Sequence, residues 1–206
     1  GNYITEEKPV FLFLTHFHLD HINGLHILNK FLFKKGLTIC CYEGGKQYLD
    51  TIMNQPYTMP IDQLPYTVKI HELKQGRHDD FPYTLECGKL IHSAYCLGYR
   101  FEFGSTAIAF CTDTGHCNTI IDLSRDADLL IAECALKEGQ KNLNWPHLGP
   151  VDAANIARLA EVKKLALIHF DAVNYTTLNM RKDAEKQASQ IFINTFSACD
   201  EMEINI

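Results

Sequence analysis

The sequence predicts an α+β fold in which sheets are flanked by helices. Short apolar segments typical of buried strands alternate along the chain with amphipathic segments of helical period. In the middle of the chain, strand-like segments follow one another closely, and Gly104-Ser105 predicts a tight turn between two of them. A length of 206 residues, with 46% apolar and 21% charged residues, suits one globular domain over residues 1–206.

The first third of the chain predicts alternating strands and helices. A continuous apolar run indicates a strand buried on both faces, and the stripe of Leu25, Leu28 and Phe31 indicates a helix that ends near Gly36. Three prolines close this part with a loop. The predicted strand, helix, strand, helix and loop are, in order, residues 10–14, 25–35, 37–42, 44–54 and 55–66.

The rest of the chain predicts a strand-rich middle followed by helices. Pro150 in a first turn and Asp152 near a helix N-terminus make residues 150–162 the clearest helix. The predicted strands are residues 67–72, 83–86, 89–95, 99–103, 106–112, 129–134 and 165–168. The predicted helices are residues 120–123, 150–162 and 178–192.

Composition indicates which kinds of binding partner and which cellular compartment suit the chain. The net charge is −6, and no basic cluster exceeds pairs such as Lys34-Lys35, which disfavours a long nucleic acid as the substrate. The longest apolar run, residues 10–14, is too short to span a membrane, and residues 1–7 show no signal peptide. None of the eight cysteines forms a Cys-x-x-Cys pair, so we expect reduced core residues in a cytoplasmic protein.

A cluster of histidine and aspartate directly follows the first predicted strand, in the segment Thr15-His16-Phe17-His18-Leu19-Asp20-His21. Imidazole and carboxylate are ligands for divalent ions such as zinc, manganese and iron. In extended chain, His16 and His18 project to the same side and can share one ion. Asp20 and His21 follow closely and can hold a second ion. Four such groups within six residues are difficult to explain by packing alone.

Three further residues follow apolar segments in the same way. Asp113 and His169 each follow directly after a predicted strand, and His92 ends the run Lys89-Leu90-Ile91-His92. Each alone is a weak signal, because a lone histidine at a strand end is more often structural. Together with the first cluster they make a set large enough for two ions.

The order His16-x-His18-x-Asp20-His21, then His92, Asp113 and His169 resembles the metallo-β-lactamase superfamily over nearly the whole chain. The resemblance implies a four-layer αββα sandwich. It also implies that His16, His18 and His92 bind a first metal and that Asp20, His21 and His169 bind a second, with Asp113 bridging the two. The ions expected are two divalent metals, zinc first, with manganese or iron as alternatives.

The segment Pro146-His147-Leu148-Gly149-Pro150-Val151-Asp152-Ala153-Ala154 resembles the ribonuclease Z and phosphodiesterase branch of that superfamily. In that branch the histidine is catalytic, so His147 and Asp20 are the catalytic candidates; a helix-capping or surface histidine is the alternative for His147. His92 and Asp113 lie 21 residues apart (113 − 92), which leaves no room for the tRNA-gripping arm of ribonuclease Z. This layout is more similar to the small phosphodiesterases.

The activity implied is hydrolysis of a small or cyclic phosphodiester by a hydroxide held between two metals. His116 is a candidate substrate contact, and Glu133 is a candidate for orienting His147. Three alternatives stay open: a ribonuclease Z-like tRNA 3′ processing endonuclease, a thioester, lactone or sulfate-ester hydrolase, and a metal-binding domain without turnover. A nucleic acid is a less favoured partner than a small phosphodiester.

The metal-binding motif begins unusually early for this superfamily. Only about fifteen residues precede it, whereas members normally have several strands there. We therefore expect the sandwich to lack its N-terminal strands and the chain to belong to a longer protein. Uncovered sheet edges favour pairing with another chain, which makes a homodimer a candidate assembly, while the sequence leaves the oligomeric state open.

Overall fold

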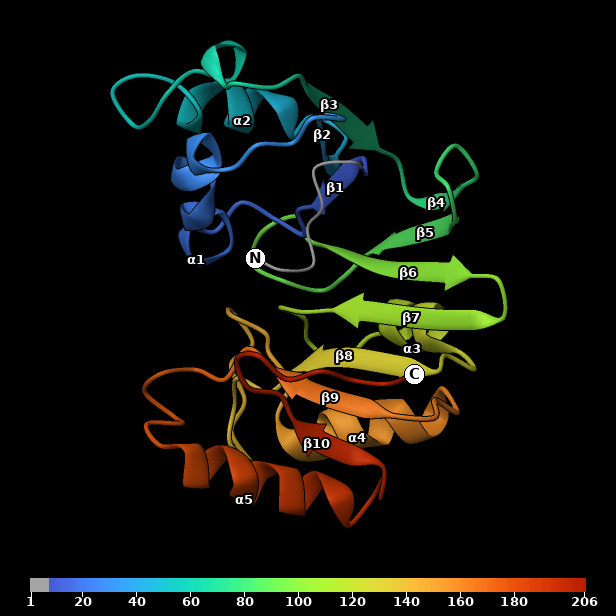
Figure 1. The fold of residues 1–206 in the computed structure, drawn as a ribbon. Coiled ribbons are helices and arrows are strands. Elements are labelled where there is room, and N and C mark those ends of the chain that lie inside the picture. The colour runs from blue at the N-terminus through green and yellow to red at the C-terminus, as the bar shows by residue number, and fades with distance from the viewer. Residues whose placement is uncertain (1–7) are drawn as a thin grey trace. The chain divides into compact units, whose positions relative to one another are not determined.

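The computed structural model describes residues 8–206. The chain divides into two compact units, residues 1–74 and residues 75–206 (Figure 1). Each unit consists of one sheet with its own helices, which agrees with the predicted alternation of strands and helices. The expectation that residues 1–206 form a single hydrolase domain remains a prediction. The expectations about residues 1–7 and about strands before them lie outside the described residues.

The first unit is built on a three-stranded parallel sheet in the order β1-β2-β3. Parallel neighbours need crossover connections, and helical segments supply them after β1 and after β2. In chain order, its elements are β1 (Val10–Phe13), α1 (Leu19–Ile22), the 3₁₀ helix η1 (Asn23–Lys30), β2 (Leu37–Tyr42), α2 (Lys46–Ile52), the 3₁₀ helix η2 (Ile61–Gln63) and β3 (Val68–Leu73).

The core of the first unit lies between this sheet and its helices. Ile39 and Cys41 of β2 and Leu49 of α2 are fully buried there, and Leu25 and Leu28 of η1 are nearly so. The helix expected over residues 25–35 is confirmed only as far as Lys30: Leu25 and Leu28 are buried as predicted, whereas Phe31 lies outside the helix and is exposed. It differs in form, because a single α-turn passes into a 3₁₀ helix that ends where Phe31 becomes extended. The sequence Asn23-Gly24 at this junction explains the change, since both residues are weak helix formers.

The second unit is built on a seven-stranded mixed sheet in the order β10-β9-β8-β7-β6-β5-β4. Strands β7 to β10 are parallel, and β4 to β7 are antiparallel. In chain order, its strands are β4 (Gly76–His78), β5 (Thr84–Lys89), β6 (Leu97–Phe103), β7 (Thr106–Cys111), β8 (Leu129–Glu133), β9 (Leu165–Ile168) and β10 (Thr195–Ser197).

Three helices of the second unit pack against this sheet (Figure 1). Helix α3 (Asn118–Ser124) contacts β5, β6 and β7, and α4 (Pro150–Leu159) contacts β8 and β9. Helix α5 (Leu178–Ser189) packs beside α4 and β10. Ala153, Ile156, Ala157 and Ala160 form the buried stripe that the sequence predicts for α4. The three small alanines of this stripe let α4 lie close to the parallel strands.

The register of the parallel strands decides where the site can form. Cys111 pairs with Ala132, and Glu133 pairs with Ile168, so β7, β8 and β9 end at the same edge of the sheet. The connection between β5 and β6 lies at this edge too, because the start of β6 pairs with the end of β7. The N–H of Gly115, after β7, donates to the carbonyl oxygen of Ile91 in that connection at 2.7 Å. We call this the carboxyl edge of the second unit.

The prediction of a strand over residues 89–95 was wrong. Strand β5 ends at Lys89, and residues 90–96 form the loop of the β5–β6 hairpin, which the Leu90 N–H closes by donating to the Cys96 carbonyl oxygen. Strands β4 and β10 were not predicted, because three residues are too few to show a period. Six of the eight cysteines are buried, as expected. Within residues 8–206, no helix has the length and apolar character needed to cross a membrane.

Candidate metal centre

The loop after β1 gathers the first four predicted ligands, which we call the loop cluster: His16, His18, Asp20 and His21. The N–H of Leu14 still donates to Cys40 at 2.8 Å, so the chain leaves the sheet only just before His16. Helix α1 begins at Leu19, and this one turn carries Asp20 and His21. A buried strand followed at once by a helical turn thus fixes four polar side chains within a short segment.

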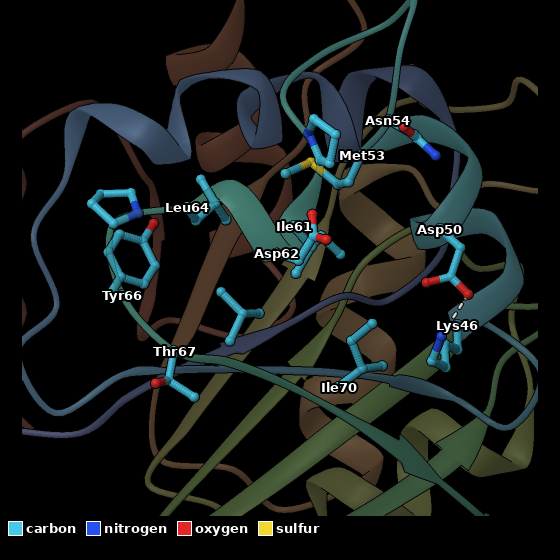
Figure 2. Close-up of a pocket in the computed structure, with 13 residues that line it drawn as sticks. Lys46, Asp50, Met53, Asn54, Ile61, Asp62, Leu64, Tyr66, Thr67 and Ile70 are labelled. Carbon is cyan, nitrogen blue, oxygen red and sulfur yellow. Dashed lines mark hydrogen bonds and ion pairs between the residues drawn. The ribbon is translucent and has the colours of Figure 1, made fainter.

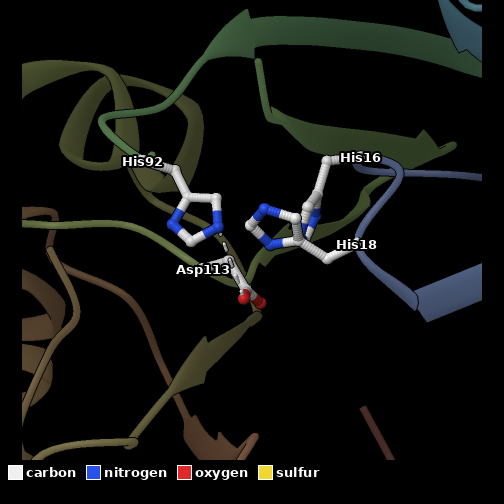
Figure 3. A group of neighbouring side chains, drawn as sticks. All are labelled: His16, His18, His92 and Asp113. Carbon is white, nitrogen blue, oxygen red and sulfur yellow. Dashed lines mark ion pairs between the residues drawn. The ribbon is translucent and has the colours of Figure 1, made fainter. Parts of the chain in front are cut away.

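The rings of the loop cluster lie close together. The ring centroid of His16 is 4.5 Å from that of His18 and 4.2 Å from that of His21. His16 is fully buried, and the hydroxyl of Thr15 lies 3.1 Å from its Nδ1. Nε2 of His21 lies 3.3 Å from the Asp20 carboxylate, whose side chain is 65% exposed. Figure 3 shows His16 and His18 on the segment that follows β1.

The second unit gathers a second group at its carboxyl edge. We call this group the edge cluster; its residues are His92, Asp113, Glu133, His147 and His169. Asp113 follows β7, Glu133 ends β8, and His169 follows β9, so the strand register brings the three together. His92 comes from the β5–β6 loop and His147 from the segment before α4. Polar groups at the carboxyl ends of parallel strands are a common form of ligand site.

Asp113 is the centre of the edge cluster. Its carboxylate oxygens lie 3.9 Å from Nε2 of His92 and 3.4 Å from Nε2 of His169 (Figure 3 shows the pair with His92). The Thr112 hydroxyl donates to Oδ1 of Asp113 at 2.6 Å and fixes the carboxylate. The side chains of His92 and Asp113 are almost fully buried, and that of His169 is 24% exposed. A buried carboxylate between two imidazoles is the environment expected of a metal ligand.

Two of these residues have unusual backbone conformations. Asp113 has φ 53° and His169 has φ 50°, in the left-handed region where aspartate and histidine are tolerated better than most residues. This conformation costs roughly 1–2 kcal/mol per residue. Both residues stand at the point where a parallel strand ends, so the turn in the chain aims the side chain along the carboxyl edge. Strained residues of this kind concentrate at functional sites.

His147 and Glu133 form a hydrogen-bonded pair beside the predicted ligands. Nδ1 of His147 lies 2.7 Å from Oε2 of Glu133, and Oε1 of Glu133 accepts from the backbone N–H of Thr114. The His147 ring centroid is 5.3 Å from that of His92 and 5.8 Å from that of His169. The Glu133 side chain is fully buried and that of His147 is 8% exposed. The pair thus lies inside the cluster rather than on the surface.

Burial and charge alter the acidity of this pair. Burial raises the pKa of Glu133 above its ordinary value, although the hydrogen bond and charge of His147 act in the opposite direction. Burial lowers the pKa of His147, but the hydrogen bond and charge of Glu133 and the charges of Asp113 and Asp171 outweigh it, so the pKa of His147 is raised. Both directions favour a proton retained between the two side chains.

The donor set fits divalent metals. His16 and His18 offer ligand atoms within 4.8 Å of each other, and so do His92 and Asp113. Asp113, His147 and His169 form a third such group, so His147 could itself be a ligand. Imidazole nitrogen and carboxylate oxygen without thiolate suit zinc, manganese or iron.

The structure also places the remaining candidates and adds residues that the sequence did not reveal. His116 is exposed, three residues after Asp113, and its side chain makes no hydrogen bond or ion pair within the described part of the chain. Thr112 and Thr114 were missed, although they hold Asp113 and Glu133 in place. Their position on either side of Asp113 was the only signal available.

The first unit also has a cavity of about 930 Å³ (Figure 2). Helix α2, the segment that follows it and β3 line this cavity, and the ion pair of Lys46 with Asp50, at 2.6 Å, lies at its wall. None of its lining residues belongs to the loop cluster. Its mixed polar and apolar lining indicates no particular chemistry.

Sequence comparison finds relatives that match most of the chain, among them a metallo-hydrolase and a ribonuclease Z. The chain is 28% identical over 189 residues to "Probable metallo-hydrolase YhfI" of Bacillus subtilis, covering 89% of this chain and 74% of that protein. It is 27% identical over 244 residues to a ribonuclease Z of Thermosynechococcus vestitus, covering 92% of this chain and 60% of that enzyme. The chain thus spans less than two thirds of this ribonuclease Z.

Solved structures show the same fold. The crystal structure of the metallo-β-lactamase fold protein YhfI from Bacillus subtilis matches with a TM-score of 0.76 at 22% identity, covering 96% of this chain and 77% of that one. The short form of human tRNase Z matches with a TM-score of 0.72 at 22% identity, covering 99% of this chain and 82% of that one. The predicted α+β fold class of the metallo-β-lactamase type is therefore confirmed.

The family model described as "Beta-lactamase superfamily domain" matches residues 4–170. This match spans well over half of the 206 residues and includes both clusters. The chain therefore belongs to the metallo-β-lactamase superfamily of metal-dependent hydrolases.

Proposed function

We propose that this hydrolase is a phosphodiesterase that acts on a small or cyclic phosphodiester and uses two divalent metal ions. His16, His18 and His92 would hold one ion, Asp20, His21 and His169 the other, and Asp113 both. The observation that carries the proposal is the Glu133–His147 hydrogen bond of 2.7 Å within the edge cluster. It supplies a positioned proton donor in addition to the ligands, which a phosphodiester with a poor leaving group requires.

The chain's own residues divide the work as follows. Thr112 holds the Asp113 carboxylate, and Glu133 holds Nδ1 of His147, so that Nε2 of His147 is left to act on the substrate. His147 would give a proton from Nε2 to the leaving oxygen, which is typically worth about 10²–10⁴ in rate. When bound, the metal pair would activate a water and neutralise charge on the phosphoryl oxygens. Asp20 contributes as a ligand beside His21.

Three observations support a small substrate over a tRNA. The segment between His92 and Asp113 contains little besides the β6–β7 hairpin and the end of the preceding loop, so it has no additional arm. The alignment with ribonuclease Z is 244 residues long, which is more than the 206 residues of this chain. Within the matched region, that enzyme therefore has insertions that this chain lacks. The net charge of −6 also disfavours a polyanion.

The main competing function is tRNA 3′ processing of the ribonuclease Z type. The 27% identity to ribonuclease Z over 92% of the chain favours it. A precursor tRNA assay beside an assay with bis(p-nitrophenyl) phosphate separates the two. A higher kcat/KM on the precursor tRNA than on bis(p-nitrophenyl) phosphate would replace our proposal with this one.

Two other functions make different predictions about His147. Thioester, lactone or sulfate-ester hydrolysis needs no proton donor of this kind at the leaving group, so the loss of His147 should leave it almost unchanged. A metal-binding domain without turnover should bind ions and remain inert towards phosphodiesters, thioesters and lactones alike.

The decisive experiment compares His147→Ala with the wild type and with His26→Ala. His26 is an exposed histidine outside both clusters, so its variant controls for the loss of one imidazole. We expect H147A to lose about 10²–10⁴ in kcat on a 2′,3′-cyclic nucleotide, whose alkoxide leaving group has to be protonated, while its metal content equals that of the wild type. Loss of metal would make His147 a ligand, and full activity would remove it from the mechanism.

A further inference from the structure

Trp145 lies at the edge cluster and has no part in the chemistry described above. It is the single tryptophan of the chain and stands two residues before His147. Its ring centroid is 5.7 Å from that of His92, with the two planes at 75°. His92 is in turn 5.3 Å from His147, so the indole belongs to the surroundings of the proposed proton donor.

The loop that carries Trp145 is held in position by the second unit itself. Oδ1 of Asn142 accepts from the backbone N–H of Asn144 at 3.1 Å and of Trp145 at 3.0 Å. The next residue, Pro146, packs so closely on Gly115 that a Cβ there would lie 3.0 Å from the Pro146 Cβ. Since Gly115 is bound to the β5–β6 loop through Ile91, the indole is positioned before any ligand arrives.

Despite these anchors, the Trp145 side chain is 47% exposed. A large aromatic surface that is fixed but half in solvent is suited to contact with another planar ring, because aromatic faces stack and remove apolar area from water. Its contact with His92, whose ring centroid lies 5.3 Å from that of His147, places it near the proposed proton donor and therefore towards the side where the leaving group would depart. An alkyl group offers no ring to stack on this surface.

We infer that Trp145 determines substrate specificity by stacking on a planar aromatic group, a nucleobase or an aryl ring, carried on the leaving oxygen of the phosphodiester. This inference rests on the proposed function for its substrate, but it can be tested without turnover. Because Trp145 is the only tryptophan, intrinsic fluorescence reports on its ring alone.

The test uses phenylphosphonate and methylphosphonate, which share the phosphonate group, cannot be hydrolysed and differ in the ring. Titrated into metal-loaded protein, phenylphosphonate should quench and shift the tryptophan fluorescence, and methylphosphonate should bind with little change. By calorimetry, Trp145→Ala should weaken phenylphosphonate roughly 5- to 100-fold, the range of one base stacking on an aromatic side chain. It should leave methylphosphonate unchanged, and Trp145→Phe should retain most of the preference.

Phe103→Ala is the matched control, because Phe103 is 48% exposed but stands at the opposite end of β6 from this edge. It should leave both affinities unchanged. If Trp145 merely supports His92, then W145A should weaken both phosphonates equally and lower the metal content, which would overturn the inference. Equal quenching by both ligands would overturn it too. A phenylphosphonate-specific quench in a protein without phosphodiesterase activity would refute only the proposed function.

Discussion

Nδ1 of His147 lies 2.7 Å from the buried carboxylate of Glu133, and the other oxygen of that carboxylate accepts from the backbone N–H of Thr114. Glu133 thus links the end of β8 to the segment after β7 and orients a histidine 14 residues away. The two contacts use both carboxylate oxygens as acceptors. Residue 133 therefore has to accept two hydrogen bonds, one on each oxygen. A glutamine amide has only one oxygen, so it cannot accept both.

Glu133→Gln should disable this arrangement without disturbing the metal ligands. The N–H of Thr114 can only donate, so the Gln oxygen must remain there and its NH₂ must face Nδ1 of His147. His147 then has to accept at Nδ1, which disfavours its protonated form. We expect a loss of roughly 10- to 100-fold in kcat, as for other residues that orient a functional histidine.

The Glu133→Gln measurement combines steady-state kinetics with metal analysis and nitrogen NMR of the imidazole. The NMR should show the hydrogen of neutral His147 moved from Nδ1 to Nε2. A variant with wild-type kcat, or with an unchanged tautomer, would contradict the proposed role of Glu133. His26→Ala again serves as the control for handling and metal content.

Removal of the metals should abolish activity and destabilise the folded chain. Ions that bind only the folded state stabilise it by about 2.7 kcal/mol at one hundred times Kd, which corresponds to a shift in Tm of roughly 5–10 °C for a chain of this size. We expect dialysis against a chelator to lower Tm by this amount and zinc, manganese or iron to restore it.

Metal analysis of ligand variants sharpens this prediction. The wild type should hold two ions per chain, and His169→Ala should reduce the content towards one. An unchanged Tm after chelation, or equal metal content in the wild type and the variant, would argue against the two-ion site.

His169 should respond to substitution through its backbone as well as its side chain. At φ 50°, alanine meets the cost of the left-handed region, about 1–2 kcal/mol, whereas glycine does not. Glycine loses about 0.5–1 kcal/mol through its greater freedom in the unfolded chain. In metal-free protein, H169G should therefore be more stable than H169A by roughly 0.5–1 kcal/mol in urea unfolding.

Val173, which is 83% exposed and has no positive φ, gives the matched pair of controls. There the order should reverse, with Val173→Ala more stable than Val173→Gly. If both positions favour alanine, then the backbone at His169 is not strained as described.

Asp128 should give an acid-dependent contribution to stability. Its carboxylate accepts from the Ala107 N–H at 2.8 Å and from Lys163 at 2.6 Å, and the hydrogen bond from Lys163 is the main cause that lowers its pKa below 3.8. A lowered pKa in the folded state means stability that is present above pH 3.8 and lost as the pH falls through the folded value.

Asp128→Asn should therefore cost about 1 kcal/mol near neutral pH, since Lys163 is exposed and the pair is screened. This difference from the wild type should shrink below pH 4, as measured by urea unfolding across the range. The exposed pair of Asp183 with Lys186 is the control, and Asp183→Asn should change stability by only a few tenths of a kcal/mol. A cost for D128N that is constant with pH would contradict the assignment.

Much of the fold and of the candidate site could be predicted from the sequence. The strands that matter most, β1, β7 and β9, are apolar runs, and a polar residue follows each of them. Because a strand period and a sudden polar residue are local features, His16, Asp113 and His169 could be identified without tertiary information. The loop position of His92 could not, since residues 90–96 are as apolar as a strand and only the β5–β6 pairing makes them a hairpin loop.

The sequence by itself determined which residues could serve as ligands, the α+β class and the family resemblance, because these depend on residue type, spacing and local period. Only the tertiary structure decided which residues meet. The register of β7, β8 and β9 brings Asp113, Glu133 and His169 to one edge of the sheet. The loops then place His147 against Glu133 and Trp145 against His92. The reason is physical: hydrogen-bond register and loop packing join residues far apart in the chain, and no local pattern encodes either of them.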